Sequence, residues 1–229
     1  MRDELYVLDL GFKNYQETWD LQKELHRLRL NNTIPDTLIL VEHDPVVTMG
    51  KSGKEKNLLM PRPLLKEKGI EYYEIERGGD ITFHGPGQLV GYLIFDIKKG
   101  LTGIKPFMHK IEDAIIETLR AFDIESCRKE KLIGIWTSKG KICSIGVAVQ
   151  RWVSFHGFAL NVNTDLKYFD LIVPCGIAGI TMTSMAQNLG NTVAINDVKE
   201  KIIDSFADIF EKETWRKCLA EITSKSQPG

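Results

Sequence analysis

The sequence of 229 residues predicts an α+β domain built around a mixed β-sheet. Three observations lead to this class. Short apolar runs and alternating segments, typical of strands, recur from residue 4 to residue 161. Three longer segments carry apolar residues three and four positions apart, as amphipathic helices do. These patterns follow one another without an internal repeat or a linker, so we expect a single domain over residues 1–229.

The strand predictions come from alternation and from short apolar runs. Glu4 to Leu10 alternates apolar and polar residues, and the run Thr-Leu-Ile-Leu-Val-Glu at 37–42 has the length of a buried strand. Ser-Lys-Gly separates two later strand patterns and predicts a hairpin turn. The expected strands are 4–10, 37–42, 46–49, 72–76, 89–97, 132–137, 141–149 and 152–161.

Three long helices and one short helix are predicted. The long ones cover 15–30, 106–122 and 198–210, and the short one covers 63–68. Asp197, followed three residues later by Glu200, resembles the N-terminal cap of the last helix. The polar tail at 223–229 is expected to fray, because few apolar residues hold it to the domain.

The charge balance limits the classes of partner. Lys plus Arg total 30 and Asp plus Glu total 31, which gives a net charge of −1. Nucleic-acid binding needs a basic surface, so no nucleic-acid partner is expected. No apolar run is long enough to span a bilayer, and the first residues lack the pattern of a secretion signal. We therefore expect a cytoplasmic protein without a membrane partner.

The distribution of charge is more informative than its total. The 65 residues from 132 to 196 contain only six charged side chains. A stretch so poor in charge predicts buried strands, an apolar pocket or both. The few charges inside it are candidates for a chemical role.

A glycine-rich loop is the first candidate site. Residues 77–88 read Arg-Gly-Gly-Asp-Ile-Thr-Phe-His-Gly-Pro-Gly-Gln. No Gly-Lys-Ser/Thr closes the loop and a strand pattern follows it, so neither a phosphate-binding loop for ATP nor a dinucleotide site is indicated. A plain turn and a ligand-binding loop both fit the glycines. Arg77 and His84 favour the ligand loop, because they add a cation and a titratable group.

The cysteines supply the second candidate. None of Cys127, Cys143, Cys175 and Cys218 has the spacing of a metal ligand, and no metal site is predicted. A small buried side chain is the commoner role for each. Cys175 could also be a nucleophile, since it follows Pro174 at the end of an apolar run. Lys141 is the best cation to activate it, with Cys143 as a rival thiol on the same strand.

Five blocks of the sequence resemble the lipoyl(octanoyl) transferase family. They are residues 40–48, 77–88, 140–146, 154–163 and 174–176, and they occur in the family's order. The resemblance implies a mixed sheet flanked by helices, like the catalytic domain of biotin and lipoate protein ligases. It also implies transfer of an octanoyl group from acyl carrier protein to a lysine of lipoyl domains of 2-oxoacid dehydrogenases or of the glycine-cleavage H protein. This would be the first step of endogenous protein lipoylation.

The resemblance also assigns residues. Cys175 would carry the acyl thioester and Lys141 would favour its thiolate. Backbone N–H groups near Cys175 and Gly176 are candidates for holding the oxyanion. No cofactor would be needed, and a monomer is implied. The acyl-binding positions would be Arg77, Gly78, Gly79, Asp80, Ile81, Thr82, Phe83, His84, Ser144, Ile145, Gly146, Gly157, Phe158 and Ala159.

Alternative functions stay open at this stage. An ATP-dependent lipoate–protein ligase would share the fold and the strand lysine but would not need Cys175. An amidotransferase of the same superfamily would take the octanoyl group from another lipoyl-type protein, and an acyl-binding module would form no covalent intermediate. For the acyltransferase, the acidic carrier protein would dock on basic residues, with Arg128, Lys129, Lys131 and Arg151 as candidates.

Overall fold

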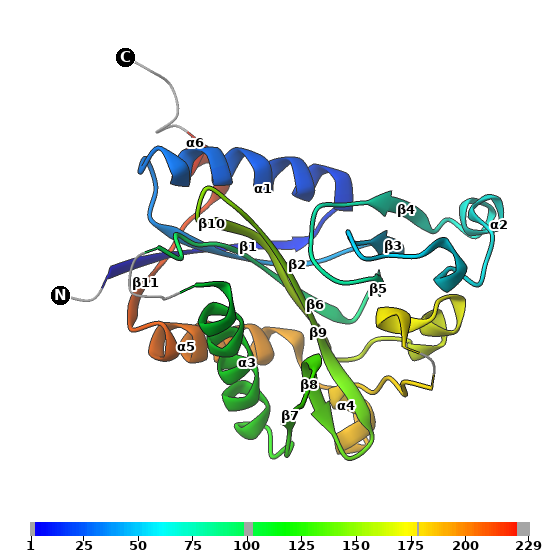
Figure 1. Cartoon of the computed structure of the whole chain (residues 1–229). Coiled ribbons are helices and arrows are strands. Elements are labelled where there is room, and N and C mark those ends of the chain that lie inside the picture. The colour runs from blue at the N-terminus through cyan, green and yellow to red at the C-terminus, as the bar shows by residue number, and fades with distance from the viewer. Residues whose placement is uncertain (1–2, 99–102, 178, 224–229) are drawn as a thin grey trace.

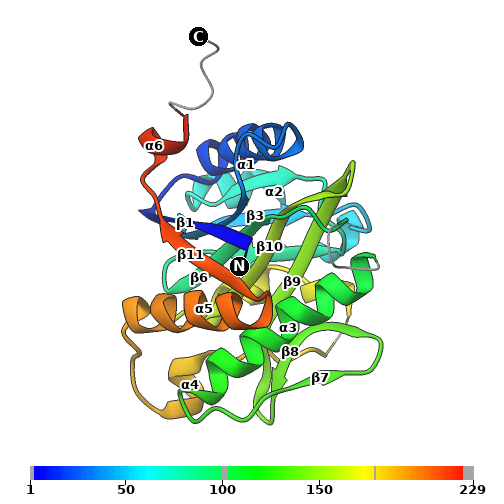
Figure 2. The same cartoon turned by 90° about the vertical axis from the view of Figure 1, so that its left-hand side faces the viewer.

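The fold combines two β-sheets with helices on both faces of the larger one (Figures 1 and 2). The computed structural model describes residues 3–98, 103–177 and 179–223. The large sheet has the strand order β11-β1-β2-β6-β10-β9-β8-β7, and the small sheet has the order β4-β3-β5. Strand β1 pairs in parallel with β2 and β11, while the other pairs of the large sheet are antiparallel. The predicted α+β class with a mixed sheet is confirmed.

The bounds of the strands and helices are as follows. The strands are β1 (Asp3–Phe12), β2 (Asp36–Glu42), β3 (Val46–Met49), β4 (Glu71–Glu74), β5 (Ile81–His84), β6 (Gln88–Ile94), β7 (Cys127–Lys129), β8 (Leu132–Thr137), β9 (Gly140–Gln150), β10 (Val153–Asn161) and β11 (Lys212–Arg216). The helices are α1 (Tyr15–Leu30), α2 (Arg62–Glu67), α3 (Ile104–Arg120), α4 (Met185–Leu189), α5 (Ile195–Ile209) and α6 (Leu219–Thr223). Short 3₁₀ turns cover Glu55–Asn57, Leu166–Leu171 and Pro174–Gly176.

Alternation along the central strands produces two cores, one on each face of the large sheet. Leu5 and Val7 of β1 point to the side of α3 and α5, whereas Tyr6 and Leu8 point to the side of α1. Figure 1 shows α1 along one face and α3 with α5 along the other. A third, smaller core lies under the small sheet and includes Phe83.

Most predicted elements are confirmed, and the exceptions have physical reasons. The loop expected over 78–88 contains a strand, β5, because residues 81–84 pair with β3. The predicted cap at Asp197 is wrong: Ala194 is the N-cap of α5 without a side-chain bond, and Asp197 lies in the first turn. There its carboxylate favours the helix electrostatically instead.

The C-terminal part of the chain contains two elements that the periodicity of the sequence did not predict. Strand β11 and helix α6 follow α5, and Thr223 ends α6. The rest of the predicted frayed tail, residues 224–229, lies outside the described residues. No helix in the described ranges combines the length and the apolar character needed to cross a bilayer.

Candidate active site

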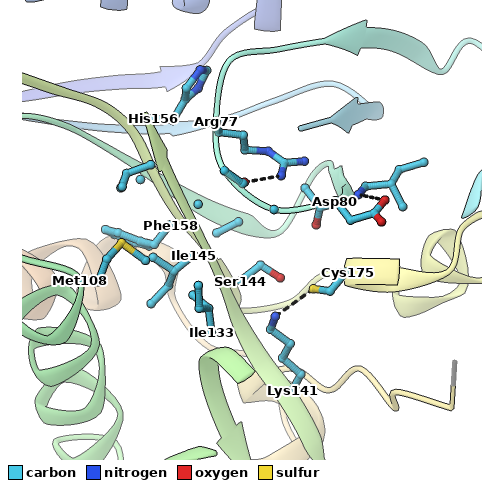
Figure 3. A pocket seen from close by; sticks show the side chains of 18 of the residues that line it. Arg77, Asp80, Met108, Ile133, Lys141, Ser144, Ile145, His156, Phe158 and Cys175 are labelled. Atoms are coloured by element: carbon cyan, nitrogen blue, oxygen red, sulfur yellow. Dashed lines mark hydrogen bonds between the residues drawn. The ribbon is translucent and has the colours of Figure 1, made fainter. Parts of the chain in front are cut away.

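A pocket of about 370 Å³ is lined by residues of both sheets and of α3 (Figure 3). This volume is within the usual range for small-molecule sites. Apolar side chains gather on one side of it, and Arg77 and His156 lie at its other end. Cys175 and Lys141 face each other at a third place on the wall. The apolar side is formed by Met108, Ile133, Ile145, Val147 and Phe158.

Lys141 is fixed in place by the strand that carries it. Its backbone N–H donates to the Thr181 carbonyl at 2.8 Å, and its carbonyl accepts from the Thr183 N–H at 2.9 Å. The side chain is only 2% exposed and passes over Gly134 of β8. A Cβ added to Gly134 would lie 2.5 Å from the Lys141 Cε, so glycine at this position makes room for the lysine.

Cys175 is held by an irregular turn rather than by a sheet. It lies in the 3₁₀ turn Pro174–Gly176 with a φ of 57°, a conformation that is unusual for a residue with a Cβ. The thiol is partly exposed, and its Sγ lies 3.0 Å from the Nζ of Lys141. A thiol and an amine able to exchange a proton with it are thus in direct contact.

The rival thiol, Cys143, lies in the core. It is fully buried, burial raises its pKa to about 12, and it is not part of the pocket wall. Regular alternation would put Cys143 on the face of Lys141, but a register shift between β8 and β9 changes the phase: Trp136 pairs with Lys141 and Ile135 with Cys143. The structure therefore favours Cys175 over Cys143.

The predicted acyl-binding residues meet at the pocket, with one exception. Phe83 does not line it, because alternation in β5 turns its ring into the third core, where it stacks on Tyr168 at 4.6 Å. That assignment needs correction. The structure brings together on the pocket wall Arg77, Gly78, Gly79, Asp80, Ile81, Thr82, His84, Ser144, Ile145, Gly146, Gly157, Phe158 and Ala159.

Arg77 forms the polar end of the pocket with its guanidinium buried. One Nη donates to the Thr48 carbonyl at 2.7 Å and to the Thr48 Oγ1 at 3.0 Å, and the other donates to the Gly78 carbonyl at 3.2 Å. Its Nε has no hydrogen-bond partner among the described residues. Burial lowers the pKa of Arg77. This cation is therefore held by neutral groups next to the pocket.

The histidines of this region are neutral and buried. His84 contacts the Gln88 Oε1 at 2.8 Å, and burial lowers the pKa of His84 to about 3. His43 is buried behind the pocket, where burial lowers its pKa to about 4. His156 lines the pocket wall, with its Nε2 3.5 Å from the Glu76 carboxylate.

Several pocket residues had no signal in the sequence. Met108 belongs to the amphipathic pattern of α3 and looks like a core residue, while Trp136 and Tyr15 look like ordinary strand and helix residues. Their approach to the pocket depends on how α1, α3 and β8 pack on the sheet. No spacing rule within one segment could have identified them.

The structure bears on two expectations: the backbone N–H groups expected to hold the oxyanion, and the basic residues expected to dock the carrier protein. The N–H of Gly176 donates to the Val173 carbonyl at 2.9 Å, so it is already used within the turn and is not a ready oxyanion donor. Arg128 lies in β7, the edge strand of the large sheet, and pairs with Glu112 at 2.7 Å. Arg151 comes after the last residue of β9, at the opposite end of that strand from Lys141. Lys131 alone of the four predicted docking residues lines the pocket.

No three His, Cys, Asp or Glu side chains in the described part of the chain are close enough to hold a metal ion. The family described as the lipoyl protein ligase A/B catalytic domain matches residues 14–207. The chain belongs to this family. The match spans the pocket, Lys141 and Cys175.

Curated proteins of this family that are similar to the chain indicate its class of enzyme. The octanoyltransferase of Dictyoglomus thermophilum is 47% identical over 199 residues, covering 86% of this chain and 84% of that protein. The octanoyltransferase of Flavobacterium psychrophilum is 43% identical over 228 residues, covering 92% of this chain and 98% of that protein. This protein is therefore an acyltransferase of the octanoyltransferase type.

Solved structures confirm the expected fold of this acyltransferase. The bi-partite lipoate protein ligase of Thermoplasma acidophilum superimposes with a TM-score of 0.73 at 16% identity, covering 99% of this chain and 91% of that chain. The biotin protein ligase of Aquifex aeolicus does so with a TM-score of 0.52 at 12% identity, covering 92% and 70%. At these identities the likeness concerns the fold alone.

Proposed function

We propose that this acyltransferase moves an octanoyl group from acyl carrier protein to one lysine of a lipoyl domain through a thioester on Cys175. The observation that carries the proposal is the 3.0 Å contact between the Cys175 Sγ and the Lys141 Nζ at the edge of a largely apolar pocket. The acceptors are lipoyl domains of 2-oxoacid dehydrogenases and the glycine-cleavage H protein. The enzyme acts as a monomer and needs no cofactor.

In the first step, the Cys175 thiolate attacks the carbonyl carbon of the donor thioester. A new C–S bond forms to Cys175, the C–S bond to the carrier breaks, and the carrier thiolate takes a proton. One thioester replaces another, so the step is close to thermoneutral and requires no nucleotide. The ammonium of Lys141 stabilises the attacking thiolate and is the proton source for the departing one.

In the second step, the amine of the acceptor lysine attacks the Cys175 thioester. The C–N bond of the amide forms, the C–S bond breaks, and the Cys175 thiolate is regenerated. Neutral Lys141 takes the proton that the acceptor amine loses, because an amine with an ordinary pKa of about 10.4 must be deprotonated to attack. Amide formation from a thioester is downhill, which drives the cycle.

The acyl chain lies on the apolar side of the pocket. Met108 of α3, Ile133 of β8 and Phe158 of β10 come from three different elements and exclude water from an eight-carbon chain. Gly146 and Gly157 also line the pocket, and their lack of a side chain lets neighbouring segments pack closely: a Cβ added to Gly146 would lie 3.0 Å from the Gly78 carbonyl oxygen, and one added to Gly157 would lie 2.2 Å from the Gly91 carbonyl oxygen.

The test is intact-protein mass spectrometry after mixing the enzyme with octanoyl-acyl carrier protein in the absence of ATP. We expect a mass gain of one octanoyl group in the wild type and in Cys143→Ala, and none in Cys175→Ala. An adduct that persists in Cys175→Ala would refute the assigned nucleophile. Acylation of a lipoyl domain by free octanoate and ATP, without the thioester donor, would indicate a ligase instead.

A further inference from the structure

A pair of residues behind the nucleophile, Asn57 and Asp80, contacts the turn that carries Cys175. We infer that this pair positions the turn so that the Cys175 thiol faces Lys141, which makes Asn57 and Asp80 positioning residues of the reaction. The inference rests on the proposed role of Cys175 as the nucleophile. Asn57 had no assigned role, and Asp80 was expected only as an acyl-binding residue.

The pair is a hydrogen-bonded unit with several anchors. The Asn57 Nδ2 donates to the Asp80 Oδ2 at 2.7 Å. The other oxygen of Asp80 accepts from its neighbour's backbone, the Ile81 N–H, at 2.7 Å and from the Lys54 N–H at 3.4 Å. Because both carboxylate oxygens are engaged, the side chain of Asp80 is fixed relative to the start of β5.

This unit is in tight contact with the residue after Cys175. A Cβ added to Gly176 would lie 2.4 Å from the Asp80 Oδ2 and 2.8 Å from the Asn57 Nδ2. Gly176 therefore packs directly against the pair, with no space for a larger residue. On the other side of the turn, the Val173 N–H donates to the Asn57 carbonyl at 2.7 Å. Asn57 thus holds the turn through its backbone before Cys175 and through its side chain after it.

The turn needs such support because its conformation is not intrinsically favoured. Cys175 and Gly176 both have positive φ, at 57° and 68°. A residue with a Cβ persists in this region only where its surroundings fix it. Lys141 is fixed by its pairing with β8 and by its backbone bonds to Thr181 and Thr183, so the distance between the thiol and the amine also depends on how the turn is held.

The main test is Asn57→Asp, which places two carboxylates together at the 2.7 Å contact. Relative to the wild type at the same pH, we expect octanoylation of Cys175 to be at least tenfold slower at pH 8 and closer to the wild-type rate towards pH 5, where the two carboxylates can share a proton. The double variant Asn57→Asp with Asp80→Asn restores one carboxylate and one amide and should regain most of the rate. Asp170→Asn, which neutralises an exposed acid just before the turn, is the matched control.

The second readout separates positioning from loss of structure and does not depend on octanoyl transfer. The rate of Cys175 alkylation by iodoacetamide is followed against pH in a Cys127→Ser, Cys218→Ser background, which removes the exposed thiols. We expect the pH profile to differ from that of the wild type in Asn57→Asp and, by less, in Asn57→Ala, because the thiol would no longer face the Lys141 amine. A lower melting temperature with an unchanged profile and rate in both variants would overturn the inference. Failure of the wild type to form an octanoyl adduct would instead reject the proposed function.

Discussion

The two ends of the pocket hold their charged groups in opposite ways. At the reactive end, the cation of Lys141 contacts a partly exposed thiol at 3.0 Å. At the buried end, the guanidinium of Arg77 is bonded to carbonyl and hydroxyl oxygens, and burial keeps His84 and His43 neutral by lowering their pKa values. In the proposed reaction, groups at the reactive end exchange protons, whereas burial keeps the histidines of the buried end neutral.

This difference predicts two kinds of variant. Changes at the reactive end should alter rates more than stability, because the groups there act in the proposed reaction. Changes at the buried end should alter stability and its pH dependence, because those groups support the wall. The following predictions test that division.

The largest expected effect is at Lys141. We expect Lys141→Met to slow Cys175 octanoylation by about 10²–10⁴-fold, since the cation and the proton donor are both lost. Lys141→Arg keeps the cation that stabilises the thiolate but is never neutral, so it cannot take the proton in the second step and should lose transfer to the lipoyl domain more than octanoylation. Single-turnover measurements of each step distinguish the two effects. Lys139→Met, at an exposed lysine of the preceding turn, should change neither rate.

At the buried end, the expected effect is a loss of folding stability in acid. His43 donates from Nδ1 to the Lys13 carbonyl and accepts the Tyr92 hydroxyl at Nε2, so it is held neutral. Its pKa is about 4 in the folded protein and about 6.5 when unfolded. The unfolded state therefore binds more protons between these values, and stability falls as the pH drops from 6.5 to 4, by about 3 kcal/mol for this one residue.

Denaturant unfolding at several pH values measures this effect. His43→Gln should be less stable at pH 7 and should show a correspondingly weaker loss on acidification. Leu28→Ala, at a buried side chain that does not titrate, is the control: it should lower stability but keep the wild-type pH dependence. An equal acid dependence in His43→Gln and in the wild type would contradict the view that the buried end fixes protonation states.

A substitution at Gly134 should change both the stability of the protein and the rate of octanoylation. In Gly134→Ala the new Cβ would lie 2.5 Å from both the Lys141 Cε and the Cys143 carbonyl oxygen, at a φ of +119°. We expect a loss of about 1–3 kcal/mol in the free energy of unfolding and a slower octanoylation, since Lys141 is displaced. Gly103→Ala has a similar φ, and its Cβ would meet no atom of the described residues within 4 Å, so it separates backbone strain from the clash. Equal octanoylation rates in the two variants would argue against a role of Gly134 in placing Lys141.

The smallest effect is expected at Cys143. Cys143→Ala should lower the free energy of unfolding by about 1 kcal/mol, because a fully buried side chain is shortened. Its octanoylation rate should match that of the wild type. A rate that falls as far as in Cys175→Ala would mean that the core thiol takes part in the reaction.

The sequence predicted the segments whose structure is determined locally. The helix over 15–30 and the strand over 46–49 have the predicted bounds, because an apolar stripe and a short apolar run are sufficient signals. Strand β11, Lys-Glu-Thr-Trp-Arg, was missed since it is an edge strand with mostly exposed side chains and no alternation. Lys141 and Cys175 were identified as a candidate pair, while their contact depends on the turn and the strand meeting in space.

The contacts that a single segment cannot encode were not predicted. Asn57 lies among lysines and a glutamate in a charged loop, and nothing in that stretch indicates a role behind Cys175. Its contact with Asp80 and Gly176 brings together three parts of the chain. Phe83 is the opposite case. It was assigned to the pocket together with the rest of the glycine-rich motif, whereas alternation along β5 turns its side chain into the third core.

The positive φ of Cys175 has a consequence for how the protein can evolve. A residue with a Cβ in this conformation costs about 1–2 kcal/mol, which glycine would avoid, although glycine also gives the unfolded chain more freedom. Cys175→Gly should therefore yield an inactive protein whose melting temperature is no lower than that of the wild type. Stability alone therefore does not account for a cysteine at this position, whereas the proposed role in the reaction does.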